Sequence, residues 1–190
     1  MQRIIVIGSP GAGKSTFSRR LGQVLGREVI YLDRAFWRPG WVEPASRREW
    51  AAQILDLIQG PAWIMDGNYG GTLDLRLGAA DTVIMLDLPA PLCTWRVLRR
   101  RIQYHGRSRP DIADGCPEKL SWEFVKYVWR FGRDKRPAML RRLARLAATK
   151  QIIYLRSSAA IESFLERQRS ANPDPRMIEA PAAEGTPSDR

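Results

Sequence analysis

The chain has 190 residues, 44% of them hydrophobic, and a formal net charge of +11 at pH 7. This length and apolar content suit one domain with a single core. No apolar run approaches the roughly 20 residues that cross a bilayer, and the N-terminus lacks the regions of a signal peptide. The two cysteines, Cys93 and Cys116, are too few for a disulfide framework and lack the paired spacing of a zinc site. We therefore expect a cytoplasmic protein without a membrane partner.

The positive charge is concentrated in one part of the chain. Residues 94–150 hold 16 Lys and Arg against 5 Asp and Glu, whereas the remainder holds 15 of each kind. A field of this sign attracts polyanions, among them nucleoside triphosphates, phosphorylated acceptors and nucleic acid. Charge alone does not choose among these partners.

Five short apolar runs indicate buried strands. Each run is followed by a loop and then a helical pattern, which is typical of βα units and of a parallel sheet with helices on both faces. The sequence therefore predicts an α/β fold. The expected strands cover residues 3–7, 29–32, 62–65, 82–88 and 151–155.

The expected helices occupy the segments between these strands. The clearest pattern spans residues 14–25, where apolar side chains recur at helical spacing on one face. Further helices are predicted over residues 47–58, 92–104 and 118–148. The last of these is expected to be interrupted near Pro137, because proline breaks a helix interior.

Two segments differ in composition from the rest of the chain. The stretch of about 104–117 is rich in Gly, Pro and Arg, which is typical of a mobile loop. From residue 169 the chain is rich in Pro, Ala, Ser and charged residues and has little that can pack. We expect one domain over residues 1–168 and a disordered tail over residues 169–190.

The segment Gly-Ser-Pro-Gly-Ala-Gly-Lys-Ser at residues 8–15 fits the pattern G-x-x-x-x-G-K-[ST]. It lies between an apolar strand and an amphipathic helix, which is the context that a phosphate-binding P-loop requires. Glycines let the main-chain N–H groups and the positive end of the helix dipole point at one anion. The residues predicted to bind the nucleotide are Gly8, Ser9, Pro10, Gly11, Ala12, Gly13, Lys14, Ser15 and Thr16.

Three residues of this segment have predicted individual roles. Lys14 reaches the β- and γ-phosphates of ATP, where it also acts in catalysis. Ser15 supplies a hard oxygen ligand for Mg²⁺, and Thr16 touches the α-phosphate. A glycine-rich turn without a ligand is the alternative, and the agreement of strand, loop, lysine and helix argues against it.

Three aspartates follow predicted strands, at the edge of a parallel sheet where ligands collect. Asp66 is predicted to hold Mg²⁺ through its water shell and to line the substrate site. Asp33 is predicted to orient or deprotonate an acceptor hydroxyl. The alternative for both is a carboxylate that caps a helix or braces a turn. For Asp87, which precedes Leu-Pro, we favour that structural role.

With these residues in place, the chain resembles the adenylate kinase-like branch of P-loop kinases, which includes shikimate and gluconate kinases. It looks closest to the bacterial proteins named DNA topology modulation proteins. The resemblance spans about residues 3–156. It rests on Gly8 to Thr16, Tyr31-Leu-Asp33 with the aromatic segment from Phe36-Trp37 to Trp41, Asp66-Gly-Asn-Tyr69, and Val83-Ile-Met-Leu-Asp-Leu-Pro89 followed by arginines.

The resemblance implies a P-loop NTPase three-layer sandwich with a five-stranded parallel sheet, ATP and Mg²⁺ as cosubstrates, and an arginine-bearing lid. Arg96 and Arg100 match the R-x-x-x-R spacing on the helix that leads into such a lid, and we assign both to catalysis. Arginines there neutralise charge on the transferring group and exclude water. Further arginine candidates are Arg107 and Arg109 in the lid and Arg130 and Arg133 on the returning helix; for each, a solvated surface role is the alternative.

The chain departs from adenylate kinases at the acceptor site. Those enzymes have Asp-Gly-Phe-Pro-Arg where this chain has Asp66-Gly-Asn-Tyr-Gly70, so the usual contact to a nucleoside monophosphate is missing. Arg76 is the candidate replacement, and Asn68 is a further predicted substrate contact. Trp37 is predicted to stack on a base or sugar, with a place in the core as the alternative.

These residues predict an ATP-dependent phosphotransferase that moves the γ-phosphoryl group to a small acceptor such as a nucleotide, a nucleoside or another metabolite. A nucleic-acid-associated ATP-binding protein is the first alternative, because the basic stretch suits a polyanion. A nucleotide-dependent switch that hydrolyses ATP slowly is the second. The sequence does not identify the acceptor.

Overall fold

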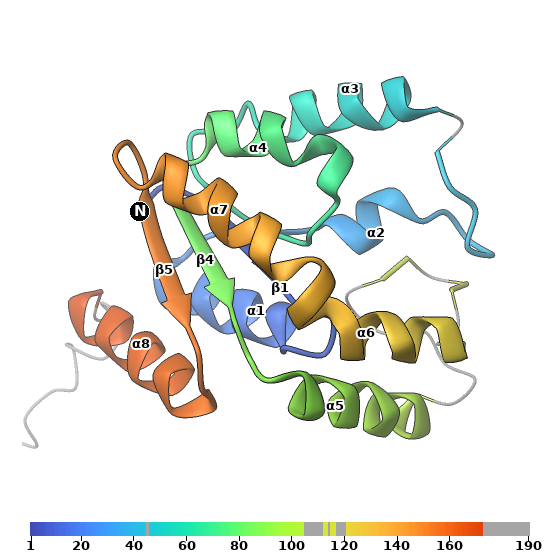
Figure 1. Cartoon of the computed structure of the whole chain (residues 1–190). Helices are drawn as coiled ribbons and strands as arrows, with labels where there is room; N and C mark the ends of the chain where they lie inside the picture. The colour runs from blue at the N-terminus through green and yellow to red at the C-terminus, as the bar shows by residue number, and fades with distance from the viewer. Residues whose placement is uncertain (45, 105–111, 114, 117–120, 173–190) are drawn as a thin grey trace, which may run out of the picture.

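Five strands form one parallel sheet in the order β2-β3-β1-β4-β5 (Figure 1). The computed structural model describes residues 1–44, 46–104, 112–113, 115–116 and 121–172. The strands are β1 (Arg3–Gly8), β2 (Val29–Tyr31), β3 (Trp63–Asp66), β4 (Thr82–Leu86) and β5 (Gln151–Leu155). The predicted α/β class and five-stranded parallel sheet are confirmed.

The central strand β1 shows why the sheet is covered on both faces. Ile4 and Val6 pack in one apolar cluster and Ile5 and Ile7 in the other, and all four side chains are fully buried. Side chains alternate between the two faces of a strand, so a strand buried on both faces is a continuous apolar run.

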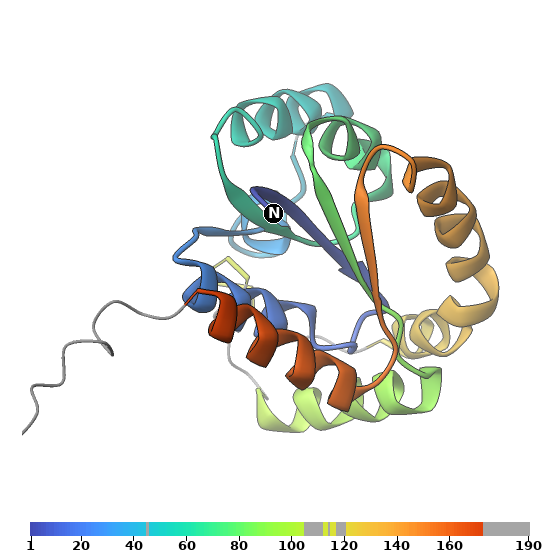
Figure 2. The ribbon, with the colours of Figure 1, turned by 90° about the vertical axis from the view of Figure 1, so that its left-hand side faces the viewer.

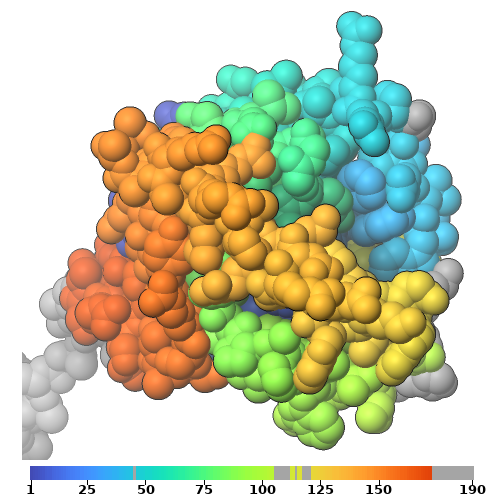
Figure 3. All heavy atoms as spheres, viewed as in Figure 1, coloured from blue at the N-terminus to red at the C-terminus, as the bar shows by residue number. Residues whose placement is uncertain are grey.

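Helices make the two outer layers. α1 and α8 cover one face of the sheet, whereas α3, α4 and α7 cover the other (Figures 1 and 2). On the first side α5 and α6 extend the layer beyond the carboxyl ends of the strands, and Figure 3 shows α6 and α7 running across the surface above α5. The helices are α1 (Lys14–Leu25), α2 (Leu32–Phe36), α3 (Arg47–Leu57), α4 (Leu73–Ala79), α5 (Ala90–Gln103), α6 (Trp122–Asp134), α7 (Arg136–Leu146) and α8 (Ser158–Ala171), with a short 3₁₀ helix at Gly70–Thr72.

The observed boundaries correct the predicted ones at several points. Leu32, expected to end a strand, is the first residue of α2, and β4 ends at Leu86 instead of residue 88. The interruption expected near Pro137 is confirmed: α6 ends at Asp134 and α7 begins at Arg136, with Pro137 in the first turn of α7, where a proline needs no N–H partner.

The C-terminal region also differs from its prediction. α8 extends to Ala171, so residues 169–171, assigned to the tail, are helical. Ser157 caps this helix by accepting a hydrogen bond from the amide of Ala160. Residues 173–190 lie outside the described part of the chain, as does most of the predicted loop at 104–117. No helix among the described residues is long and apolar enough to cross a bilayer.

Asp87 joins the sheet to α7. Arg136 donates from Nε to Oδ1 of Asp87 at 2.6 Å and from a terminal nitrogen to Oδ2 at 2.7 Å. Only 7% of the Asp87 side chain is exposed, and the carboxylate is also 3.7 Å from Arg156. This geometry agrees with the structural role favoured for Asp87.

We expect Arg136→Ala to lower the free energy of unfolding by about 2 kcal/mol, because the substitution leaves a buried carboxylate without its two-point partner. Denaturant unfolding followed by circular dichroism measures this change. The matched control is Arg133→Ala, since Arg133 is 75% exposed and pairs with its neighbour Asp134; its effect should stay within about 0.5 kcal/mol. Equal effects of the two substitutions would contradict the structural role of the pair formed by Arg136 and Asp87.

Candidate nucleotide and acceptor site

A cavity of about 680 Å³ opens at the carboxyl ends of β1, β2 and β3. Its walls come from the loop after β1, the start of α1, the ends of β2 and β3, and the helices α5, α6 and α8. The cavity therefore lies where a parallel sheet presents its loops and helix N-termini. The predicted site residues that line it are Pro10, Gly11, Ala12, Gly13, Lys14, Ser15, Thr16, Asp33, Asp66, Asn68, Arg96 and Arg100.

The loop at residues 8–13 has the backbone of a phosphate cradle. Gly8 and Gly11 have φ values of 144° and 79°, a region that favours glycine. A Cβ atom at Gly8 would lie 2.3 Å from the carbonyl oxygen of Leu86, and one at Gly11 would lie 2.2 Å from that of Cys93. Helix α1 then begins at Lys14 without a side-chain cap, so its first amides remain available to an anion.

Lys14 lies over this loop. Its Nζ donates to the carbonyl oxygens of Gly8 at 3.2 Å and Ser9 at 3.1 Å. Burial lowers the pKa of Lys14 below its ordinary value of 10.5, although the charges of Asp66 and Asp33 act in the opposite direction. The ammonium group therefore lies half-buried in the wall of the cavity, where its charge is placed to interact with phosphate.

Ser15 and Asp66 are the oxygen donors that fit a magnesium ion. Both line the same cavity, and Asp66, at the end of β3, is 6% exposed. Hydroxyl and carboxylate oxygens are the hard ligands that Mg²⁺ prefers, and a nucleotide-bound Mg²⁺ needs only one or two of them from the protein. The described residues contain no group of three or more His, Cys, Asp or Glu suited to a metal.

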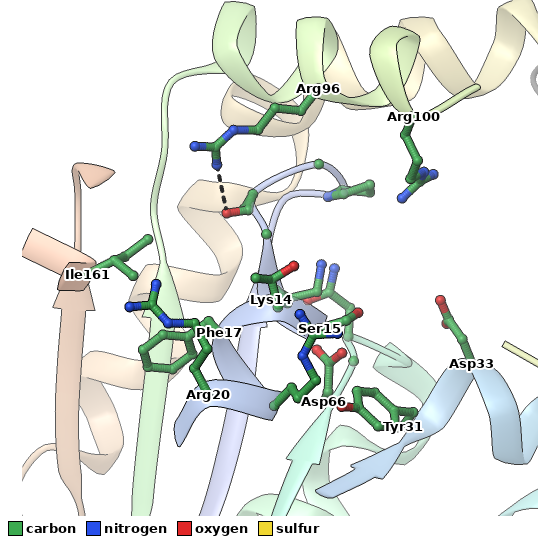
Figure 4. Close-up of a pocket in the computed structure, with 18 of the residues that line it drawn as sticks. Lys14, Ser15, Phe17, Arg20, Tyr31, Asp33, Asp66, Arg96, Arg100 and Ile161 are labelled. Carbon is green, nitrogen blue, oxygen red and sulfur yellow. Dashed lines mark hydrogen bonds between the residues drawn. The ribbon is translucent and has the colours of Figure 1, made fainter. Parts of the chain in front are cut away.

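The cavity has two ends on either side of Lys14 and Ser15 (Figure 4). Arg20 and Ile161 lie on one side, whereas Tyr31 and Asp33 lie on the other. Arg96 and Arg100 reach in from α5, which runs above the cavity in this view. A nucleotide bound through its phosphates at the centre would thus leave the end at Asp33 for a second substrate.

Arg96 links α5 with the phosphate loop and with α8, at the end of the cavity where Arg20 and Ile161 lie. It donates from one terminal nitrogen to the carbonyl oxygen of Ala12 and from the other to Oγ of Ser158, both at 3.2 Å. Beside it, the terminal nitrogens of Arg20 donate to both carboxylate oxygens of Glu162 at 2.6 Å. Arg20 and Glu162 were not predicted from the sequence. Arg20 lies one helical turn after Thr16, and this spacing could have indicated that both residues face the same side of the helix.

At the second end, Tyr69 is a site residue that the sequence analysis did not assign. Its hydroxyl donates to Oδ1 of Asp33 at 2.9 Å, and both residues line the cavity. Tyr69 stands in the segment quoted for the family resemblance, but no sequence pattern predicts which carboxylate its phenol meets. The predicted catalytic roles of Asp33, Arg96 and Arg100 remain predictions, and all three residues line this cavity.

Arg76 is not available to a substrate, so its assignment as an acceptor contact is wrong. The residue is 0% exposed and does not line the cavity. Its guanidinium donates to the carbonyl oxygens of Gly67 at 2.9 Å, Asn68 at 2.5 Å and Tyr69 at 3.0 Å. Burial lowers the pKa of Arg76 to about 10, which leaves the group charged at neutral pH.

Asn68 clamps the first residue of the phosphate loop. Its Oδ1 accepts from the amide of Gly8 at 3.0 Å, and its Nδ2 donates to the carbonyl oxygen of Gly8 at 2.8 Å. The amide side chain thus continues the pairing of β3 with β1 past the end of the strand. A substrate contact by Asn68 stays a prediction.

Trp37 is outside the cavity lining and packs in an aromatic cluster. Its ring centroid is 5.0 Å from that of Phe36 and 5.3 Å from that of Trp41, in edge-to-face geometry. Phe36 in turn contacts Trp50 and Tyr69. Trp37 is half-buried and belongs to neither apolar cluster of the sheet, so its predicted stacking on a base or sugar stays a prediction.

The remaining arginine candidates do not add to the described site. Arg130 and Arg133 are exposed on α6 and are absent from the cavity lining. Arg107 and Arg109 lie outside the described residues.

We expect Arg96→Ala to raise the KM for ATP roughly 10-fold, because the loss of a charge-assisted hydrogen bond loosens the loop at Ala12. Steady-state ADP production at varied ATP measures this change. Arg99→Ala is the matched control, since Arg99 is exposed on the same helix and should leave the KM unaltered. An unchanged KM in both variants would remove Arg96 from the nucleotide site.

The lowered pKa of Lys14 predicts a pH dependence. Lys14 loses its proton at a lower pH than an exposed lysine, so kcat/KM for ATP should fall on the alkaline side with a midpoint below 10.5. Circular dichroism at each pH checks that the protein stays folded. A kcat/KM that holds constant until the fold is lost would contradict the prediction.

Comparison with known proteins agrees with this geometry. No protein-family model matches the chain. The chain is 32% identical over 131 residues to a shikimate kinase of Halorhodospira halophila (strain DSM 244 / SL1), and the match covers 61% of this chain and 70% of that protein.

Two solved structures share the fold. One is shikimate kinase from Acinetobacter baumannii in complex with shikimate, with a TM-score of 0.55 and 18% identity over 92% of this chain and 96% of that one. The other is a protein of Chloroflexus aurantiacus assigned as a kinase, with a TM-score of 0.50 and 19% identity over 88% of this chain and 96% of that one. By its fold, its P-loop and its sequence identity to a curated relative, the chain belongs to the shikimate kinase-like P-loop kinases, which are phosphotransferases.

Proposed function

We propose that this kinase transfers the γ-phosphoryl group of ATP to a hydroxyl group of a small molecule bound beside Asp33, in the cytoplasm. The observation that carries the proposal is that one cavity has the P-loop at its centre and the Asp33 carboxylate at one end. Asp33 is held by Tyr69 at 2.9 Å and is thus presented in one orientation.

The P-loop positions ATP. Main-chain amides at the start of α1 and the Lys14 ammonium bind the phosphates, while Arg96 and the pair of Arg20 and Glu162 border the opposite end of the cavity, where the nucleoside lies. Ser15 and Asp66 would hold a Mg²⁺ ion, which would supply charge neutralisation at the phosphate oxygens.

Asp33 receives the proton of the acceptor. As the acceptor oxygen forms its bond to the γ-phosphorus, the bond from that phosphorus to the bridging oxygen of ADP breaks, and the hydroxyl proton passes to the Asp33 carboxylate. Arg100 reaches the same space from α5, where a guanidinium stabilises charge on the transferring group. We keep an arginine-bearing lid at about residues 104–117 as part of the proposal.

The acceptor class follows from what the site offers. A nucleoside monophosphate is disfavoured, because the chain lacks the family arginine at Gly70 and Arg76 is committed to backbone carbonyls. The relatives named shikimate kinase make shikimate the first acceptor to test. The closer likeness to DNA topology modulation proteins stays a prediction, and stimulation by nucleic acid is its test.

The test is ADP production from ATP and Mg²⁺ across shikimate, other hydroxylated acids, sugars, nucleosides and nucleoside monophosphates, with DNA and RNA as further additions. We expect one small acceptor to raise turnover well above the rate with water alone, and Lys14→Ala to abolish that increase. If only DNA or RNA raises turnover, the small-molecule kinase proposal fails and the nucleic-acid alternative replaces it.

We further expect Asp33→Asn to lower the kcat of acceptor-dependent transfer roughly 100- to 1,000-fold, because the amide cannot accept the proton. The KM for ATP should change little, since Asp33 lies at the acceptor end of the cavity. Asp56→Asn is the matched control, as Asp56 is exposed on α3 away from the cavity. A variant Asp33→Asn with wild-type kcat would remove Asp33 from the reaction.

A further inference from the structure

The loop of residues 67–69 follows β3 and has an unusual backbone. Tyr69 has φ 29° and ψ 71°, and a positive φ is rare for a tyrosine. Gly67, with φ 139°, is packed so closely that a Cβ atom would lie 2.9 Å from Cβ of Leu32. A strained residue beside a reaction site persists only where its surroundings hold it.

Arg76 restrains this loop through three hydrogen bonds. From α4, one guanidinium group meets the carbonyl oxygens of all three loop residues, and the residue is completely buried. A buried charge is costly unless it is hydrogen-bonded, so these three bonds oppose any movement of the loop. The backbone of Tyr69 is therefore fixed by a side chain of α4.

The Tyr69 side chain is fixed as well. Its ring packs at 4.8 Å from Phe36 and 5.4 Å from Trp50, between centroids. Its hydroxyl also interacts with the side chain of Trp37 and donates to Oδ1 of Asp33. Burial, followed by the negative charge of Asp33, raises the pKa of the phenol, so Tyr69 remains a hydrogen-bond donor at working pH.

We propose that Tyr69 is a positioning residue for phosphoryl transfer, whose phenol holds the Asp33 carboxylate toward the acceptor hydroxyl. The proposal deepens the function proposed above and rests on the role of Asp33 given there. In this proposal the strained backbone of Tyr69, its aromatic neighbours and the buried Arg76 together fix the position of Oδ1 of Asp33.

The positioning role predicts different effects on the two substrates. Tyr69 contacts the acceptor end, so loss of its hydroxyl should impair the transfer step more than the binding of ATP. Misplacement of a reacting group by a fraction of an ångström is enough to lower kcat substantially. A merely structural tyrosine would affect both substrates alike or neither.

The first experiment needs no acceptor. In protein labelled with ¹³C at aspartate, the carboxyl carbon resonance of Asp33, assigned with Asp33→Asn, should shift in Tyr69→Phe. Tyr154→Phe is the matched control: Tyr154 lies on β5, outside the cavity lining, and its loss of a hydroxyl should leave the resonance in place. An unmoved Asp33 resonance in folded Tyr69→Phe overturns the proposal.

The second experiment is a double-mutant cycle with the panel's best acceptor, beginning with shikimate. Tyr69→Phe should lower kcat roughly 10-fold and change the KM for ATP less than about 2-fold. In the Asp33→Asn background the same change should have no further effect, because Tyr69 acts through Asp33. Independent, multiplying effects, or a wild-type kcat in Tyr69→Phe, overturn the proposal.

The two substitutions distinguish the proposed role of Asp33 from the positioning role of Tyr69. If Asp33→Asn leaves transfer unaltered, the proposed function of Asp33 fails and the role of Tyr69 fails with it. If Asp33→Asn abolishes transfer while Tyr69→Phe does not affect it, the function stands and only the positioning role is lost.

Discussion

A buried guanidinium that donates to three backbone carbonyl oxygens is the constraint on which the site depends. Arg76 donates to the three carbonyl oxygens of residues 67–69, and two side chains of that loop contact opposite parts of the site. Asn68 pairs with both backbone groups of Gly8 at the start of the phosphate loop, while Tyr69 holds Asp33 at the acceptor end. One segment therefore connects the phosphate loop with Asp33, and under the proposed function it sets the spacing between the nucleotide and the acceptor. In-line phosphoryl transfer depends on that spacing, because the protein contributes positioning and charge neutralisation and little covalent chemistry.

The parallel sheet explains why these groups can meet. The register pairs Val6 of β1 and Tyr31 of β2 with Asp66 of β3, so the three strands end at one edge. The loop after each strand then delivers its polar residues to the same space, and the N-terminus of α1 adds its amides. Burial of Lys14 in this setting strengthens its interaction with phosphate at the cost of a lowered pKa. Arg96 and Arg100 of α5 line the same cavity, so part of the basic stretch lies beside this site.

The sequence predicted the parts of this structure that have strong local signals. The P-loop was identifiable because a strand, a glycine pattern, a lysine and a helix agree within 25 residues, and Asp33 and Asp66 followed from their places after apolar runs. The prediction for Arg76 was wrong because spacing along the chain does not show whether a side chain points into a cavity or under a loop. The hydrogen bond between Tyr69 and Asp33 joins residues 36 positions apart, and no local sequence pattern predicts such a contact. The positive φ of Tyr69 is likewise not predicted by the local sequence. Arg107 and Arg109 lie beyond the described residues, so their predicted place in a lid stays a prediction.

The most direct test of the account follows the γ-phosphoryl group itself. The protein is incubated with ATP labelled in the γ-phosphate, Mg²⁺ and each small acceptor in turn, and the labelled products are separated and identified by mass spectrometry. The account predicts that the label appears in a phosphate ester of one small hydroxylated acceptor. Label found only in inorganic phosphate with every acceptor would contradict it, because the enzyme would then hydrolyse ATP without transferring the phosphoryl group.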